Sequence, residues 1–267
     1  MAATVYPFPA DGAMSKMMSN IATFRFYEEL NDFFAKGKRK ATIPVYFRGN
    51  PTVKDIIESI GVPHTEVDLI LVNSKSVNFS YHLKNGDRVS VYPVFESLDI
   101  SNVTHLRAKP LRQPKYILDV HLGKLAKYLR MLGFDTRYKN NYHDSQIVSI
   151  AGDEKRIILT RDIGILKIKK VTCGYWIRSQ NPKKQLQEVI GHFDLYSSIK
   201  PFHRCMDCNG IIKKVKKESI HDNMEEKTKK YYNEFYRCKS CGKIYWQGSH
   251  YDRMKKFIED LKGMDSA

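Results

Sequence analysis

Residues 115–138, KYILDVHLGKLAKYLRMLGFDTRY, decide the fold of the chain. The segments 115–120 and 134–138 are short and carry β-branched and aromatic residues, which predicts two strands. Between them, apolar residues recur at the spacing of one helix face, and Gly133 ends the repeat. The repeat consists of Leu122, Leu125, Ala126, Leu129 and Leu132. A strand, a helix and a second strand form the unit of a parallel sheet, so we predict an α/β domain.

The alternation of strands and helices continues to residue 193. We expect a helix at 145–151, a strand at 156–160, a short helix at 164–169, a strand at 172–178 and a helix at 182–193. Asn181 is suited to cap the last helix, and Pro182 suits its first position. Residues 115–200 therefore form an α/β domain with a mainly parallel sheet, and its chemistry belongs at the carboxyl ends of the strands.

The preceding residues, 22–100, have the pattern of a smaller domain. We expect strands at 22–30, 42–48, 69–72, 77–79 and 88–93, with a turn at 85–87. A helix at 53–60 stands between the second and third strands, with Thr52 as its N-cap and Gly61 as its stop. This order predicts a ubiquitin-like β-grasp. The last strand runs on into more protein and not into a free Gly-Gly, so we expect an interaction or positioning module without conjugation or sulfur-transfer chemistry.

The remaining segments are a leader at 1–21, which we expect to be disordered, and a linker with two prolines at 101–114. No charged start is followed by an apolar run, and no stretch has membrane-spanning length. We therefore expect a cytoplasmic protein with no membrane partner.

Two Cys-x-x-Cys pairs predict a metal site in residues 201–267, ahead of a C-terminal helix. The pairs are Cys205 with Cys208 and Cys238 with Cys241, and the spacer between them is 29 residues long. Four thiolates can surround one zinc ion tetrahedrally and leave no position for water, so the zinc would be structural. Four unrelated buried cysteines are one alternative. Disulfides are another, although i, i+3 pairs suit a metal better and nothing marks the chain as secreted.

The net charge of +16 lies entirely in the second part of the chain. Residues 1–100 carry no net charge, residues 101–200 carry +11 and residues 201–267 carry +5. Such an excess attracts polyanions, of which nucleic acid is the usual one. The alternative is that the lysines only keep the protein soluble.

Three carboxylates are expected at one edge of the parallel sheet. Asp119 ends the first strand of the domain, Asp162 follows the third, and Asp144 opens the helix after the second. Carboxylates that converge need a compensating cation, and oxygen ligands select Mg²⁺ or Mn²⁺, so we predict a catalytic metal site. Each residue also has a structural interpretation, as a helix cap for Asp144 and Asp162 and as a partner of the next turn for Asp119. Asp135 is a fourth candidate, which we expect to be structural.

Basic and polar residues near these carboxylates are candidates for binding the substrate backbone. Three lie on the polar face of the first helix of this domain, and three flank strand ends; they are Lys124, Lys127, Arg130, Arg161, Arg178 and Ser179. In the cysteine-rich region, the lysines of 213–217 could contact phosphates, and Tyr245 and Trp246 could stack on bases or belong to a small core. We expect His250 to be structural.

Residues 117–162, which contain DVHLGKLA, HDSQIVSIAG and RIILTRD, resemble the Mut7-C RNase domain family, a PIN-like nuclease fold. The resemblance continues through PFHRCMDCNG and YRCKSCGKIYWQGSHYDRM into the family's zinc ribbon. Residues 23–100 resemble the ubiquitin-like domain often fused in front of it. The family's metal-binding acids carry over to Asp119, Asp144 and Asp162.

The resemblance implies a metal-dependent ribonuclease that leaves a 5′-phosphate and a 3′-hydroxyl. Its partners would be transfer, ribosomal or messenger RNA, with the ribosome and DNA left open, and a protein partner could bind the ubiquitin-like domain. A second hypothesis is a non-catalytic RNA- or ribosome-binding factor on a nuclease-like fold. A third is a toxin-like nuclease held inactive by a partner, or by its own ubiquitin-like domain.

Overall fold

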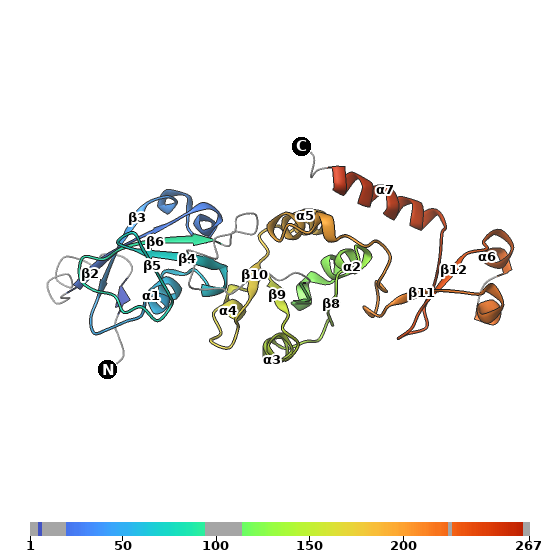
Figure 1. Ribbon diagram of the computed structural model, residues 1–267, viewed down its shortest axis with the longest axis horizontal. Coiled ribbons are helices and arrows are strands. Elements are labelled where there is room, and N and C mark those ends of the chain that lie inside the picture. The colour runs from blue at the N-terminus through green and yellow to red at the C-terminus, as the bar shows by residue number, and fades with distance from the viewer. Residues whose placement is uncertain (1–4, 7–19, 94–113, 224–225, 264–267) are drawn as a thin grey trace. The chain divides into compact units, whose positions relative to one another are not determined.

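The computed structural model describes residues 5–6, 20–93, 114–223 and 226–263 (Figure 1). They fall into two compact units. The first takes residues up to 112 together with 162–176, and the second takes 113–161 and the chain from 177 onward. Within the described residues, no helix is both long and apolar enough to cross a membrane.

The first unit contains a mixed six-stranded sheet in the order β1-β3-β2-β6-β4-β5. Its strands are β1 (Val5–Tyr6), β2 (Asn20–Phe26), β3 (Thr42–Phe47), β4 (Val67–Val72), β5 (Lys75–Val77) and β6 (Arg88–Pro93). The central pair β2 and β6 is parallel, whereas β2–β3 and β4–β6 are antiparallel. One helix, α1 (Val53–Ile60), buries Val53, Ile56 and Ile57 in the core of this unit. The arrangement is β-grasp-like and confirms the predicted fold class.

The ends of α1 are the predicted ones. The Thr52 hydroxyl accepts the Asp55 amide, and the Asp55 carboxylate accepts the Thr52 amide, so each residue satisfies a donor of the other. Gly61 closes the helix with a φ of +121°. Because every one of these groups lies within a few residues of the helix, the local sequence alone was enough to place it.

The N-terminal part of the first unit differs from the prediction in two places. The strand predicted at 22–30 ends at Phe26, and a 3-10 helix occupies Glu28–Phe33, since Glu28 has a φ of +44° that no strand can contain. Val5–Tyr6 pairs with β3, although it falls within the predicted leader. The other leader residues up to 19, and the predicted linker but for its last residue, lie outside the described part of the chain.

Residues 162–176 have their own partners in the first unit. They include α4 (Ile163–Leu166) and β10 (Gly174–Trp176). The Trp176 amide donates to the Glu66 carboxylate over 2.6 Å, and His64 Nε2 lies 2.8 Å from the Val171 carbonyl oxygen. Lys167 donates to the Glu58 carbonyl. Buried polar groups of the β-grasp part therefore bind this segment.

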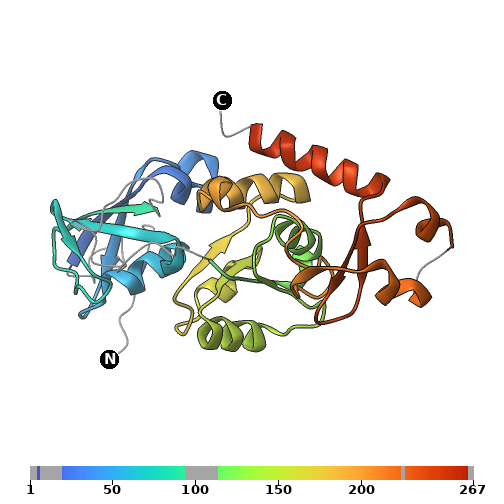
Figure 2. The same ribbon diagram turned by 45° about the vertical axis from the view of Figure 1, so that its right-hand side comes forward.

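The second unit is built around a parallel sheet that contains β9, β7 and β8 in this order. β7 (Tyr116–Leu118) lies between β8 (Thr136–Arg137) and β9 (Ile157–Thr160), and both pairings are parallel, as predicted. Helices α2 (Gly123–Met131) and α5 (Pro182–His192) lie on one side of the sheet and α3 (Asp144–Glu154) on the other (Figure 2). The strands are shorter than predicted, and a 3-10 turn at Val120–Leu122 separates β7 from α2.

The cysteine-rich region forms a separate three-stranded antiparallel sheet, β11-β12-β13. Its strands are β11 (Ile212–Val215), β12 (Phe235–Cys238) and β13 (Ile244–Trp246). The spacer predicted as an irregular loop contains a 3-10 helix at Lys217–Asn223 and α6 (Glu226–Tyr231). The C-terminal helix α7 (Ser249–Gly263) lies near α5 (Figures 1 and 2), where Lys183 Nζ is 5.2 Å from the centre of the Phe257 ring. The same ring lies 5.4 Å from that of Tyr128 in α2.

We expect Gly133→Ala to destabilise the protein by more than about 1 kcal/mol. Gly133 has a φ of +98°, and a Cβ atom there would lie 2.3 Å from the Lys200 carbonyl oxygen. The control is Gly152→Ala in α3, where a Cβ atom meets nothing within 4 Å. Alanine is the better helix former, so this variant should gain about 0.5–1 kcal/mol of stability. Urea unfolding followed by circular dichroism measures both; equal stability of the two variants would contradict this account.

Candidate functional site and metal centre

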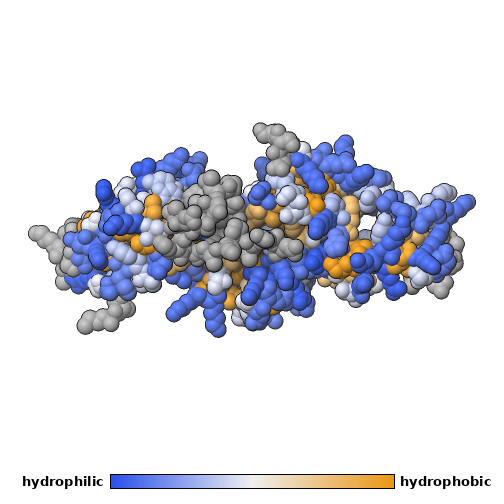
Figure 3. Space-filling model, viewed as in Figure 1, coloured by the Kyte–Doolittle hydropathy of each residue, from blue (hydrophilic) through white to orange (hydrophobic). Residues whose placement is uncertain are grey.

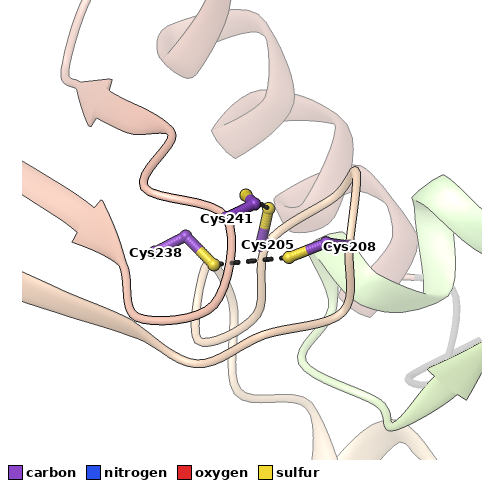
Figure 4. A group of neighbouring side chains, drawn as sticks. All are labelled: Cys205, Cys208, Cys238 and Cys241. Carbon is purple, nitrogen blue, oxygen red and sulfur yellow. Dashed lines mark hydrogen bonds between the residues drawn. The ribbon is translucent and has the colours of Figure 1, made fainter.

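The four cysteines come together at one end of the three-stranded sheet (Figure 4). Their sulfur atoms all lie within 4.8 Å of one another. The Sγ atoms of Cys205 and Cys241 are 3.6 Å apart, and those of Cys208 and Cys238 are 3.4 Å apart. Tetrahedral zinc with Zn–S bonds of about 2.3 Å needs sulfurs about 3.8 Å apart, so this group could hold a structural metal such as zinc.

The surroundings of the cysteines suit thiolate ligands unequally. Burial raises the pKa of Cys208 to about 12, and the neighbouring thiols add to the effect. Burial also acts on Cys205, but the Tyr245 hydroxyl at 3.0 Å and backbone amides outweigh it and lower the pKa to about 7. A bound cation would favour the thiolate form of all four. Gly210 is required beside them, since a Cβ atom would lie 2.8 Å from the Cys238 sulfur.

The predicted carboxylates occupy three different settings. Asp119, directly after β7, is 5% exposed and accepts a hydrogen bond from the Thr160 hydroxyl over 3.0 Å. Asp162 is exposed and caps α4 through the Gly164 amide. Asp144 is the exposed first residue of α3, whose N-cap is His143 and not Asp144. Among the described residues, the cysteines are the one group of metal-ligating side chains close enough to share an ion. The carboxylate site remains a prediction.

A basic cleft of about 730 Å³ opens beside Asp119. Val120 and His121, the next residues of the chain, line it. It brings together three of the predicted substrate-binding residues, Lys124, Lys127 and Arg161, and adds Lys139. Its only carboxylate among the described residues, Asp207, forms an ion pair with Lys243. The cleft therefore presents an excess of positive charge to an incoming ligand.

Three other residues expected to bind substrate do not line this cleft. Arg130 is buried, and its guanidinium donates to the carbonyl oxygens of Thr136, Met206 and Asp207 at 2.9, 3.1 and 2.8 Å. We therefore correct its assignment to a structural one. The amides of Arg178 and Ser179 donate to the Glu188 carboxylate, which fixes the start of α5.

Asp135 joins the parallel sheet to the first cysteine pair. Its carboxylate accepts hydrogen bonds from Arg156 at 2.7 Å, Asn209 at 2.8 Å and Arg204 at 3.2 Å. Burial alone would raise the pKa of Asp135, but the hydrogen bonds from Arg156 and Asn209 and the nearby positive charges outweigh it and hold the pKa below its usual value. These partners agree with the structural role expected for Asp135.

The sequence interpretation missed Lys139, Asn140 and Asn141, which also line the cleft. They follow β8 at its carboxyl end, so the rule that places ligands at strand ends could have found them. It also missed Arg204 and Asn209, for which no local pattern exists because their partner Asp135 is about 70 residues away.

Comparison with known proteins gave two family matches. The Mut7-C RNase domain matches residues 114–258, and the Mut7-C ubiquitin domain matches residues 19–99. Searches among curated proteins and among solved structures found no significant match.

Replacement of one cysteine should remove the metal. We expect Cys238→Ser to lower bound zinc from about one ion per chain to about none, because three thiolates leave the tetrahedron open. The control Cys173→Ser lies outside the group and should keep its zinc. Metal analysis of the purified chains decides between these outcomes; equal zinc in both variants would refute the site.

Asp135→Asn should cost about 2 kcal/mol of stability at neutral pH, since it removes a charge that three donors share. The lowered pKa sets the pH dependence. The carboxylate stabilises the fold fully above its unfolded pKa of about 3.9, and this contribution is lost as the pH falls through the lower folded value. The free energy of unfolding of the variant should therefore approach that of the parent at acidic pH. Urea unfolding across acidic pH tests this, with exposed Asp153→Asn as the control; a gap that stays constant with pH would contradict it.

Proposed function

Because the chain belongs to the Mut7-C RNase domain family, we propose that it is a metal-dependent ribonuclease that hydrolyses the phosphodiester bonds of RNA. The family match supports a nuclease-like role. The observation that carries the finer proposal is the basic cleft. Its Arg161 directly precedes Asp162, and its Lys124 and Lys127 lie on α2, the helix that follows Asp119.

The cleft has the chemistry needed to bind a phosphate backbone. Lys124 and Lys127 stand three residues apart on α2, so both project from the same exposed face. Arg161 comes from the end of β9 and Lys139 from the end of β8. Cations from separate elements that surround one cleft can contact successive phosphates of a strand.

The predicted acids fit a hard divalent cation by their donor chemistry, because all three offer carboxylate oxygens. In this proposal Asp119, Asp144 and Asp162 bind Mg²⁺ or Mn²⁺. The ion would supply positive charge to the scissile phosphate and polarise the attacking water. The protein's own part is to orient Asp119 through the Thr160 hydroxyl and to position the RNA through the lysines and arginines of the cleft.

The substrates included in the proposal are transfer, ribosomal and messenger RNA, since phosphate contacts do not distinguish them. The ubiquitin-like domain would bind a protein partner, and we place the activity in the cytoplasm. Deletion of residues 1–100 is a poor test of that domain's role, because it would remove Glu66 and His64 from the segment 162–176 that they bind. Point variants avoid this loss.

The nuclease prediction is tested with end-labelled total RNA. The parent should cleave it in Mg²⁺ or Mn²⁺, and Asp119→Asn with Asp162→Asn should lower the rate by at least about a hundredfold, because the ion loses two ligands. An asparagine at 119 can still accept the Thr160 hydrogen bond, so the fold should be kept. The matched control is Asp153→Asn with Asp194→Asn, two exposed acids outside the proposed site.

Three results are informative. Metal-dependent cleavage that the double variant lacks and the control retains supports the ribonuclease. Cleavage that persists in the double variant rejects these acids. Binding of RNA without cleavage by any chain would instead favour the non-catalytic RNA- or ribosome-binding factor.

A further inference from the structure

A second cavity lies between the three-stranded sheet, the segment 201–206 and α7. It encloses about 240 Å³, and five of its lining residues are aromatic. The rings are those of Phe202, Tyr236, Tyr245, Trp246 and Tyr251. Figure 3 shows hydrophobic surface in this part of the molecule with hydrophilic surface around it.

These rings are placed as a binding surface and not as a closed core. Trp246 is 41% exposed, and the three tyrosines are only partly buried. Tyr245 is fixed by its hydrogen bond to the Cys205 sulfur, and Phe202 packs on Tyr251 with ring centres 4.7 Å apart. The wall is therefore preformed, and its side chains lose little conformational freedom when a ligand stacks on them.

The cavity wall also contains polar donors. Arg204 lines it, and a guanidinium carries five N–H donors. Each terminal nitrogen uses one N–H, one for the Asn209 carbonyl and the other for the Asp135 carboxylate, and keeps a second N–H. Gln247, also in the wall, offers an amide donor and acceptor.

We propose that this cavity binds one unpaired nucleobase of an RNA strand. A base has flat faces that stack on aromatic rings and an edge of acceptors and donors suited to Arg204 and Gln247. The net charge of +5 in residues 201–267 favours the attached phosphates over a neutral or cationic ligand. The inference deepens the proposed function, on which it rests for the identity of the polymer.

The cavity and the basic cleft are lined by consecutive residues of the chain. Met206 lines the cavity, and Asp207 lines the cleft. A strand whose phosphates lie in the cleft can therefore place a nearby base in the cavity. Bases inside a duplex are stacked on each other and cannot enter, so the substrate class is single-stranded RNA or the loops of folded RNA.

The test uses the full chain with Asp119→Asn and Asp162→Asn, so that RNA is not degraded. Trp246→Ala in this background should weaken binding of a short single-stranded RNA by at least about fivefold, the lower range for loss of one base stack. The matched control is Tyr231→Ala, an aromatic residue that is 71% exposed and outside the cavity, which should bind as the parent does. Zinc content and circular dichroism confirm that each chain is folded.

A second measurement keeps the inference falsifiable if Trp246→Ala perturbs the ribbon. With Trp176→Phe, Trp246 is the remaining tryptophan, and its fluorescence should be quenched by the single-stranded RNA but not by the same RNA made without bases. Equal quenching by both, or unchanged affinity in a folded Trp246→Ala chain, overturns the base pocket. Base-dependent quenching without cleavage by the parent would overturn the proposed ribonuclease and leave the pocket standing.

Discussion

The buried guanidinium of Arg130 connects the parallel sheet to the four-cysteine cluster. Arg130 is 4% exposed, and its donors satisfy carbonyl oxygens of Thr136 in β8 and of Met206 and Asp207 between the first two cysteines. Burial lowers the pKa of Arg130, while the charges of Cys205, Cys208, Asp207 and Asp135 act to raise it. Since an arginine starts far above neutral pH, it remains charged. The cost of desolvating the guanidinium is offset by its hydrogen bonds and by the negative charge near it. Thiolate forms of the neighbouring cysteines would increase that negative charge.

Asp135 makes the same connection with the opposite sign of charge. It accepts from Arg156 in the sheet domain and from Arg204 and Asn209 around the first cysteine pair. Two charged side chains thus hold the cysteine region. The buried guanidinium of Arg130 binds carbonyl oxygens, and the half-buried carboxylate of Asp135 binds two arginines and an asparagine amide. Removal of one partner from such a network leaves others unsatisfied, which costs more than an exposed ion pair would. The position of the cysteine pair relative to β8 is therefore strongly determined.

The parts of the structure that the sequence predicted are those determined by near neighbours. Thr52 and Gly61 bound α1, Asn181 and Pro182 begin α5, and the cysteine spacing predicted a group of four thiols that could hold a metal. Helical periodicity also predicted α2 but put Arg130 on its polar face. It could not show that this side chain meets carbonyls 76 and 77 residues further along the chain, which a helix pattern does not contain.

Only part of the candidate site was predictable from the sequence. The polar face of the first helix led to Lys124 and Lys127, and a strand end led to Arg161; the structure gathers all three in one cleft. The aromatic cavity was visible only as Tyr245 and Trp246, because Phe202 and Tyr251 come from segments on either side of the sheet in sequence. A concave wall assembled from separate segments has no sequence period, so only the folded chain reveals it.

The two binding surfaces divide the work of recognition if both proposals hold. The cleft carries lysines and arginines, which attract any strand and lose strength as salt screens them. The cavity offers stacking, which salt affects less and which requires an unpaired base. The Tyr245 hydroxyl is hydrogen-bonded to the Cys205 sulfur, and Arg130 holds Met206 and Asp207. The cysteine cluster therefore helps to orient the wall of the cavity and the neighbouring part of the cleft. A structural zinc ion would then influence RNA selection without taking part in the chemistry.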